Sequence, residues 1–478
     1  MYTPFGLFIH GEWRQASDGG RAAVLSPVTE APLGEVPLAT VADTEEAIAS
    51  AQRGFQAWRA KLGFERADAL HAIADEMLRR RAEGARMISA ETGKPVAQSE
   101  REWTLSIDQF RWFAEEARRI YGRLIESRVP NGRFEVSHEP VGIAAAFTAW
   151  NFPAALIARK VAPALAAGCS VILRPSSQTP GVAMVMVDCL RAGQLPAGAV
   201  NLVVGSTAQT YQPIMASPLV RKVSLTGSTR VGQQMIRDAA ATLKKVSMEL
   251  GGNAPLIVYD DADLELALNV AVPTKFANAG QVCVTPDRFF VHESIHEAFV
   301  QGFVQRTAAL QLGDGLDPSV QMGPLINAGR FNEMEAITAE AVQQGARVAF
   351  GGRRCSDRPQ GHFFMPTVLV DVDDGMRVFE QENFGPIAAI TRFRTDDEVL
   401  QRANQSDMGL SAYAFTTSPK RARRTVAELK AGMVGINSFA LAASEAPFGG
   451  TKYSGMGREG GTEGIADYLD TKLAQVVF

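Results

Sequence analysis

Apolar residues in the first 120 positions recur at three- and four-residue spacing, the pattern of helices with one buried face. One such set follows Asp43, which the spacing predicts as an N-cap. A later helix is predicted to end at Thr92, because Gly93 suits a C-cap and Pro95 cannot continue a helix. Another is predicted near 99–120, where aromatic side chains indicate helix core. The first two apolar sets are Ala47, Ile48, Ala51, Phe55 and Trp58, then Leu70, Ile73, Ala74, Met77 and Leu78.

From residue 141 the pattern changes to short apolar runs separated by helical segments. Strands are predicted at 141–146, 170–173, 201–204, 220–225, 255–258, 288–291, 348–350 and 387–393. Short buried strands that alternate with helices predict βαβ units and parallel sheets, as in nucleotide-binding domains. We therefore predict an α/β protein with a second α/β unit over about 250–445. The tail 473–478 is predicted as a strand without a local partner, whose edge another chain or a distant segment has to cover.

The charge balance and composition exclude several classes of protein. The chain has 48 Lys and Arg against 52 Asp and Glu, so its formal net charge is −4 and no basic surface for nucleic acid is expected. A hydrophobic content of 46% argues against disorder. No run of about 18 apolar residues could cross a membrane, and the first residues lack the pattern of a secretory signal. These features predict a cytoplasmic enzyme with no membrane and no nucleic-acid partner.

Two motif matches lack the context that their chemistry needs. Residues 455–460 fit GxGxxG, but only 18 residues follow, too few for the βαβ unit of a dinucleotide fold. His292 and His296 fit HExxH, but Ser294 and Glu297 form a capping box that predicts a helix start at about Ser294. The two histidines then do not share a helical face. Because the four cysteines are also scattered, we predict no metal site.

Other segments place chemically useful groups at the ends of predicted strands. Cys283 follows a flexible glycine and precedes a strand, whereas the other three cysteines fit small buried hydrophobes. Glu249 ends a buried strand at a glycine pair, a position that also suits a simple turn residue. Asn151 lies where a strand gives way to a helix, at the sheet edge where ligands bind. Gly227 and Ser228 open another helix, whose free N–H groups and dipole suit a phosphate.

Together and in this order, these segments resemble the aldehyde dehydrogenase superfamily. The most specific pairing joins Glu249-Leu250-Gly251-Gly252 to Gly280-Gln281-Val282-Cys283, and Glu91-Thr92-Gly93-Lys94-Pro95 and Pro447-Phe448-Gly449-Gly450 extend it. The resemblance implies a Rossmann-like cofactor domain over 1–120 and 141–248 and a second α/β catalytic domain over 249–446. It also implies a β oligomerisation arm with bridging segments over 121–140 and 447–478. In that arm the terminal strand finds its partner in a neighbouring subunit, as in a homodimer or homotetramer.

The resemblance implies covalent oxidation of an aldehyde to its acid. Cys283 attacks the carbonyl as a thiolate, and the site has to activate it because a free thiol has a pKa of about 8.5. The Asn151 amide and the Cys283 backbone N–H donate to the oxyanion of the thiohemiacetal. Hydride loss leaves a thioester, which water cleaves with Glu249 as general base. Relatives that pass the acyl group to coenzyme A lack this glutamate, so its presence favours the free acid.

The resemblance also implies NAD or NADP as cofactor. The family pattern for the dinucleotide site carries over onto Trp150, Arg174, Pro175, Ser176, Ser177, Gly227, Ser228, Leu250, Glu382 and Phe384. Glu382 is expected to hold the nicotinamide ribose. Arg174 replaces the usual Lys and offers a fork suited to phosphate, and Ser177 replaces a carboxylate that repels a 2′-phosphate. We therefore predict use of both cofactors with a lean to NADP.

Within the family, the segments 245–255 and 176–180 resemble succinate-semialdehyde dehydrogenases, which anchor the distal carboxylate with two arginines and a serine. Arg159 matches the first arginine, whereas Ala277 and Ala442 stand where the second arginine and the serine are expected. A lost charge-assisted bond costs about 1.5–3 kcal/mol. Succinate semialdehyde is therefore weighed against α-ketoglutaric semialdehyde and uncharged aliphatic or aromatic aldehydes. A cofactor-free hydrolase and a non-catalytic protein that retains the fold are the alternatives of another class.

Overall fold

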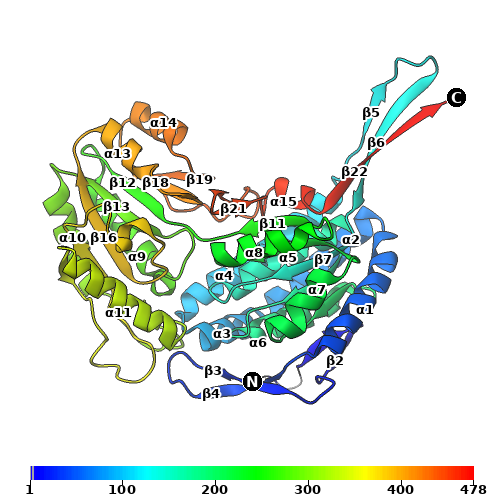
Figure 1. The fold of residues 1–478 in the computed structure, drawn as a ribbon, viewed down its shortest axis with the longest axis horizontal. Coiled ribbons are helices and arrows are strands. Elements are labelled where there is room, and N and C mark those ends of the chain that lie inside the picture. Colours follow the sequence, from blue (N-terminus) through cyan, green and yellow to red (C-terminus); the bar gives the residue numbers. More distant parts are fainter. Residues whose placement is uncertain (1, 3–4) are drawn as a thin grey trace.

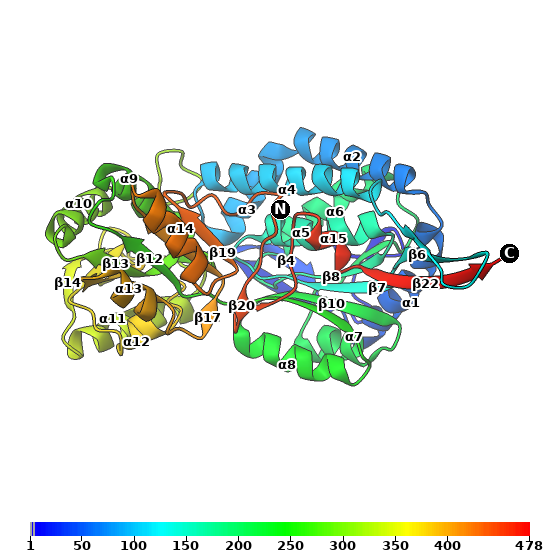
Figure 2. The same cartoon turned by 90° about the horizontal axis from the view of Figure 1, so that it is seen from above.

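The computed structural model describes Tyr2 and residues 5–478. Two α/β units lie side by side, and a long β arm projects from one of them with the C-terminus at its end (Figure 1). Seen from above, the sheet of each unit is flanked by helices, and the arm extends away from the second unit (Figure 2). The predicted α/β class, with two parallel-strand units and a β arm, is confirmed.

The sheet of the first unit has eight strands in the order β2-β1-β9-β8-β7-β10-β11-β21. Its five central strands are parallel, and their order reverses between β7 and β10, which makes a doubly wound sheet with a switch point there. The strands are β1 Leu7–Ile9, β2 Glu12–Arg14, β7 Ile143–Phe147, β8 Ser170–Arg174, β9 Val200–Leu202, β10 Val220–Thr226, β11 Lys245–Glu249 and β21 Gly455–Met456.

Helices cover both faces of this sheet, so alternate residues of one strand enter different cores. Ala144 and Ala146 of β7 pack with α2–α6, whereas Ile143, Ala145 and Phe147 pack with α1, α7 and α8. Burial on both faces explains the continuous apolar runs from which these strands were predicted. The helices are α1 Val41–Arg59, α2 Gly63–Arg79, α3 Arg81–Thr92, α4 Val96–Ala117, α5 Pro153–Ala167, α6 Pro180–Leu190, α7 Gln212–Ala216 and α8 Thr229–Ala240.

The second unit has a seven-stranded sheet in the order β14-β15-β16-β13-β12-β18-β19, parallel except for β14. Its strands are β12 Ala254–Val258, β13 Pro286–His292, β14 Arg347–Phe350, β15 Thr367–Val370, β16 Ile387–Phe393, β18 Ser411–Phe415 and β19 Met433–Ile436. Its helices are α9 Leu264–Phe276, α10 His296–Ala308, α11 Ala328–Gln343, α12 Arg377–Glu380, α13 Asp396–Ala403 and α14 Pro419–Glu428. The short elements β3 Arg21–Leu25, β4 Pro32–Pro37, β17 Met408–Gly409, β20 Thr451–Lys452 and α15 Glu463–Ala466 complete the fold.

In the arm, a distant segment of the same chain covers one edge of the terminal strand, which is one of the two possibilities that its sequence left open. β22 Leu469–Val477 pairs antiparallel with β6 Gly132–Pro140, which pairs in turn with β5 Arg123–Glu126. The paired residues are 329 to 345 positions apart in sequence, which explains why local patterns do not reveal the pairing. β22 is an edge of this three-stranded sheet.

Two helix starts and one core residue also differ from prediction. The N-cap of α1 is Thr40, and Asp43 is its partner in a capping box three residues on. α10 begins at His296 after Ile295, with no side-chain cap, so the predicted start at Ser294 is wrong. Leu78 of α2 is 48% exposed, because it lies beside the buried stripe rather than in it.

Candidate active site

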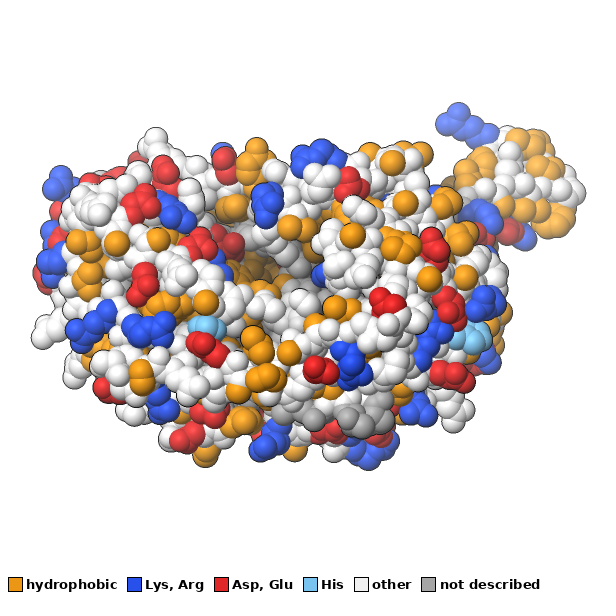
Figure 3. Space-filling model, turned by 60° about the horizontal axis from the view of Figure 1, so that its bottom comes forward, with side chains coloured by type: hydrophobic (Ala, Val, Ile, Leu, Met, Phe, Trp, Pro, Cys, Tyr) orange, Lys and Arg blue, Asp and Glu red, His pale blue; other side chains and the backbone are white. Residues whose placement is uncertain are grey.

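The cysteine and its predicted partners gather where the two units meet. The cleft between the units contains a cavity of about 640 Å³ whose lining includes Ser228 from the first unit and Glu382 from the second. A space-filling view shows a hollow near the middle of one face, with hydrophobic side chains at its floor (Figure 3). The carboxyl ends of β7 and β10 open into this region, as expected of a switch point in a doubly wound sheet.

Cys283 lies on a tightly folded loop between α9 and β13. Asn278, Ala279 and Gly280 have φ angles of 48°, 54° and 71°, so three successive residues adopt the left-handed region. A Cβ on Gly280 would lie 2.1 Å from the carbonyl oxygen of Gly385, which explains the glycine. Cys283 is half-buried, and Leu410, Met433 and Phe448 pack around it.

Asn151 is held directly against this loop. It precedes Pro153, the first residue of α5, and its side chain is buried. Asn151 Nδ2 donates to the Gln281 carbonyl at 3.2 Å, and the Asn151 carbonyl accepts from Asn278 Nδ2 at 3.1 Å. The structure therefore brings the predicted amide donor and the cysteine loop together from positions 130 residues apart.

Glu249 ends β11 in an enclosed position without a partner. The residue is 4% exposed, and neither carboxylate oxygen has a hydrogen-bond partner among the described residues. Burial, followed by the charge of nearby Glu459, raises the pKa of Glu249 well above its ordinary value. A buried carboxylate without a hydrogen bond is costly, which marks Glu249 as a group placed for something other than stability.

The Cys283 thiol is likewise far from its reactive form. Burial, then the charges of Glu249 and Glu382, raise the pKa of Cys283 to about 12. The thiol is therefore neutral near pH 7, and removal of its proton is an activation step that the site has to perform.

Three of the residues predicted for the cofactor site, including the predicted nicotinamide-ribose ligand Glu382, lie on segments that meet near the cysteine loop. Trp150 and Phe384 meet edge to face, with ring centroids 5.6 Å apart. Glu382 Oε1 accepts from the Gly252 backbone N–H at 2.8 Å, and burial raises the pKa of Glu382 to about 7. Its loop is fixed through Asn383, whose backbone N–H donates to Asp287 Oδ2 at 3.0 Å.

The predicted adenosine-end residues are arranged partly as expected. Arg174 Nη2 donates to the Gly205 carbonyl at 2.9 Å, so part of its guanidinium is already used, while Ser177 is exposed. Ser228 is the N-cap of α8, but the Gly227 N–H donates to the Glu249 carbonyl at 3.0 Å. The expectation of a free N–H at Gly227 is therefore wrong.

Pro175, Ser176 and Leu250 complete the predicted set. Pro175 and Ser176 follow the end of β8, and the Ser176 carbonyl accepts from the Thr179 N–H at 3.2 Å in the turn before α6. Leu250 packs against Gly232 of α8, where an added Cβ would lie 2.5 Å from the leucine side chain. Leu250 therefore fixes how closely α8 approaches the strand that ends at Glu249.

Arg159 stands apart from the other buried charges. It is 3% exposed, and its guanidinium lies over the Phe448 ring at 4.0 Å from the centroid. Within the described part of the chain it forms no ion pair, and its Nε has no hydrogen-bond partner. Phe448 also belongs to the hydrophobic cluster against which Cys283 packs, and the charge of Arg159 acts on the pKa of Cys283, so this cation lies near the thiol.

Contacts across the fold add groups that local sequence patterns did not select. Lys160 of α5 donates to Glu459 and, at 2.7 Å, to Thr226 Oγ1, next to Glu249. Gln281 Oε1 accepts from the Ile326 N–H at 2.9 Å and so anchors the cysteine loop. The GxGxxG match that contains Glu459 consists of strand β21 and the loop that follows it, and no helix begins there as a dinucleotide fingerprint requires.

Comparison with known proteins decides the family. The model of the aldehyde dehydrogenase family matches residues 13–474, almost the entire chain. The chain belongs to the aldehyde dehydrogenase family. It is 44% identical to a 3-sulfolactaldehyde dehydrogenase of Pseudomonas putida, over 97% of this chain and 95% of that protein. It is 43% identical to an NADP(+) succinate-semialdehyde dehydrogenase of Escherichia coli K12, over 97% and 96% of the two chains.

The fold agrees with this membership. The crystal structure of a succinate-semialdehyde dehydrogenase from Burkholderia pseudomallei superposes with a TM-score of 0.97, at 40% identity over 99% of this chain and 98% of that chain. The protein is thus an NAD(P)-dependent enzyme that oxidises an aldehyde, and the resemblance found in its sequence is confirmed. A cofactor-free hydrolase activity and a non-catalytic role are therefore not its main function.

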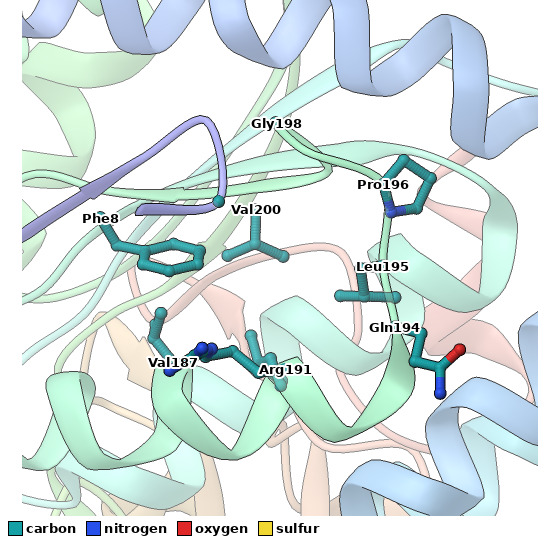
Figure 4. Close-up of a pocket in the computed structure, with 10 residues that line it drawn as sticks. Phe8, Val187, Arg191, Gln194, Leu195, Pro196, Gly198 and Val200 are labelled. Atoms are coloured by element: carbon teal, nitrogen blue, oxygen red, sulfur yellow. The ribbon is translucent and has the colours of Figure 1, made fainter. Parts of the chain in front are cut away.

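Other features of this aldehyde dehydrogenase carry no comparable chemistry. A pocket of about 190 Å³ beside β1 and β9 is lined by Phe8, Val187, Leu195 and others, with Arg191 as its one charged side chain (Figure 4). The described residues contain no cluster of three or more His, Cys, Asp or Glu placed to hold a metal ion. None of the described helices combines the length and the apolar character that a bilayer crossing requires.

Proposed function

We propose that Cys283 is the nucleophile of this aldehyde dehydrogenase. Its thiolate adds to the aldehyde carbon, so that an S–C bond forms and the carbonyl electron pair moves to oxygen. The Asn151 amide and the Cys283 N–H are the donors for that oxyanion; losing one such donor typically costs about 10²–10³ in rate. The proximity of Asn151 to the cysteine loop supports this role.

Glu249 acts as the general base in the second half of the reaction. Bound NAD or NADP supplies the hydride acceptor, and the adduct becomes a thioester on Cys283. Glu249 takes a proton from water as the water oxygen attacks the thioester carbon, and the sulfur leaves as thiolate. Two observations support this assignment. Neither carboxylate oxygen of Glu249 has a hydrogen-bond partner among the described residues, and the carboxylate is close enough to Cys283 to raise its pKa.

The cofactor-binding residues fit a dinucleotide by their chemistry. Glu382 offers a carboxylate to ribose hydroxyls, Trp150 and Phe384 form an aromatic wall, and the start of α8 at Ser228 suits a phosphate. Pro175, Ser176 and Leu250 would shape the turns around it, and Arg174 and Ser177 would face the adenosine ribose. Because Ser177 carries no charge that opposes a 2′-phosphate, both cofactors are accepted with a lean to NADP.

The aldehyde carries an anionic group at its far end. The observation that supports this proposal is Arg159, a buried cation near Cys283 that forms no ion pair or hydrogen bond with a described residue. Burying an unpaired charge is expensive, so an anion that arrives with the substrate gains the whole pairing energy. Two relatives are named for 3-sulfolactaldehyde and for succinate semialdehyde, and these two aldehydes carry a sulfonate and a carboxylate group. The alanines Ala277 and Ala442 leave room for an acid bulkier than succinate semialdehyde.

The assembly is a cytoplasmic homodimer or homotetramer joined through the arm. The arm exposes apolar side chains that a monomer would leave in water: Tyr121, Leu124, Ile125, Leu473, Val477 and Phe478. In this scheme 1–120 and 141–248 form the cofactor domain, 249–446 the catalytic domain, and 121–140 and 447–478 the arm and bridging segments. Light scattering of the purified protein separates a dimer or tetramer from a monomer, and a monomer would contradict the scheme.

A panel of aldehydes tests the substrate proposal. Initial rates at 340 nm are compared for succinate, glutarate and α-ketoglutaric semialdehydes, 3-sulfolactaldehyde, hexanal and benzaldehyde, each with NAD and with NADP. A kcat/KM for the best anionic aldehyde at least about tenfold above that for the uncharged ones supports the proposal, since a charge-assisted bond gives about this factor. Preference for hexanal or benzaldehyde would contradict it.

A further inference from the structure

A buried ion pair lies beneath the turn that carries Asn151. Lys94 follows Gly93 at the end of α3, and Glu102 lies nearly two turns into α4. The side chains of both residues are fully buried, and Lys94 Nζ is 2.5 Å from Glu102 Oε2. Glu102 lies outside every segment used to recognise the family, and Lys94 has no role in the chemistry proposed above.

Lys94 directs its remaining contacts at the residues around Asn151. Its Nζ donates to the Asn151 carbonyl at 2.7 Å and lies 3.8 Å from the centroid of the Phe152 ring. An ammonium group has three N–H donors, and here the carboxylate, the carbonyl and the ring face account for all three. The lysine thus fixes both the backbone of Asn151 and the side chain of its neighbour.

Glu102 holds the other end of the same turn. Its second oxygen, Oε1, accepts from the backbone N–H groups of Ala154 at 2.8 Å and Ala155 at 3.3 Å. These are free donors at the start of α5, and Phe152, the N-cap residue, gives no side-chain cap. A carboxylate supplied by α4 therefore caps α5 and matches the positive end of its dipole.

We propose that Lys94 and Glu102 are positioning residues of the oxyanion hole, an inference that rests on the proposed role of Asn151. The pair forms hydrogen bonds at both ends of the short turn from Asn151 to Ala155 and so fixes the direction of the Asn151 side-chain amide. A buried ion pair is weak evidence for stability as such. Here every further side-chain hydrogen bond of the pair within the described chain leads to one turn. A misplacement of about 1 Å at a catalytic group can cost 10²-fold in rate.

A double-mutant cycle separates positioning from general structural support. The main variant is Lys94→Met with Glu102→Gln, which leaves no unpaired buried charge and keeps an amide oxygen for the Ala154 N–H. It is made alone and together with Asn151→Ala. The readout is the first-order rate of reduced-cofactor formation in a single turnover, with enzyme in excess over succinate semialdehyde, beside NADP affinity and thermal stability.

Positioning through Asn151 predicts a non-additive result. The Lys94–Glu102 variant should slow the single turnover by about 10–100-fold, part of the loss expected for one oxyanion donor, with unchanged NADP affinity. In the Asn151→Ala background the same two substitutions should change the rate less than about threefold, within the usual additivity error. Lys222→Met, which removes another buried lysine in contact with Ser247, should leave the rate within about twofold in both backgrounds.

Each other outcome has a defined meaning. Equal slowing in both backgrounds, or no slowing, would overturn the positioning role while leaving Asn151 in place. If Asn151→Ala itself leaves the rate unchanged, the proposed role of Asn151 fails, and the inference that rests on it fails with it. If the double variant does not fold, Glu102→Gln alone carries the test, because it also removes the ion pair. Failure of both to fold would assign the pair to folding and contradict the proposal.

Discussion

Lys94 and Arg159 are both buried cations of the first unit, yet their surroundings differ completely. Lys94 has a carboxylate, a backbone carbonyl and an aromatic face as partners. Arg159 has one aromatic ring and, among the described residues, no acceptor. Glu102 and Glu249 repeat the contrast, since the first accepts hydrogen bonds with both oxygens and the second with neither.

The difference between the paired and the unpaired charges matches the roles proposed for them around Cys283. The paired charges of Lys94 and Glu102 fix the turn that carries Asn151, and the free-energy cost of burying them is offset by contacts within the protein. In the proposed mechanism the unpaired charges of Glu249 and Arg159 meet water and substrate, and the cost of burying them is offset when these bind. A buried charge without a protein partner is therefore the more informative sign of chemistry, and variants of Glu249 and Arg159 test this rule.

The largest effect is expected for Glu249→Gln. Loss of a general base typically costs about 10²–10⁴ in rate, so steady-state kcat should fall at least about 100-fold. Hydride transfer precedes deacylation, so single-turnover formation of reduced cofactor should stay within about tenfold of the wild type. Stopped-flow absorbance at 340 nm measures both, with Glu463→Gln as an exposed control. An unchanged steady-state rate would remove Glu249 from the base role.

Arg159→Met sharpens the contrast with Lys94. Loss of a charge-assisted bond of about 1.5–3 kcal/mol should lower kcat/KM for the anionic aldehyde about 10–150-fold and leave benzaldehyde within about threefold. Because the variant removes an unpaired buried charge, its melting temperature should not fall, unlike that of Lys94→Met, which strands Glu102. Differential scanning fluorimetry gives the melting temperatures, and Arg191→Met is the exposed control. A clear drop in stability for Arg159→Met would show that the fold itself uses this cation.

At the cofactor site, Ser177→Glu should shift the preference between cofactors. The new carboxylate repels a 2′-phosphate and can accept a bond from a 2′-hydroxyl, so the ratio of kcat/KM for NADP to that for NAD should fall about tenfold or more. Ser177→Gln, similar in size but neutral, is the matched control. Equal ratios for the glutamate and glutamine variants would mean that the adenosine ribose lies elsewhere.

The smallest effect is a pH dependence of stability. A carboxyl group with a raised pKa in the folded state contributes stability that is fully present below the unfolded pKa, about 4.5, and is lost as pH rises through the folded pKa. The melting temperature of Glu249→Gln, relative to wild type, should therefore be higher at pH 8 than at pH 5. A constant difference across this range would contradict a raised pKa of Glu249.

Local sequence patterns predicted most of the fold but not the pairing around the site. Buried strands and the helix end at Gly93 follow from hydrophobic runs and backbone preferences of single residues. The α1 cap was misplaced by three residues because Asp43 also takes part in the capping box, as the partner of Thr40. The contact between β22 and β6, and that between Lys94 and Asn151, join distant segments through packing, which no period in the sequence encodes.

The covalent role of Cys283 is tested most directly by intact-protein and peptide mass spectrometry of Glu249→Gln after mixing with succinate semialdehyde and NADP. We predict a stable acyl adduct on the Cys283 peptide that forms only when the cofactor is present and is absent from Cys283→Ala. Turnover without any adduct on Cys283, or an adduct on another residue, would contradict the account.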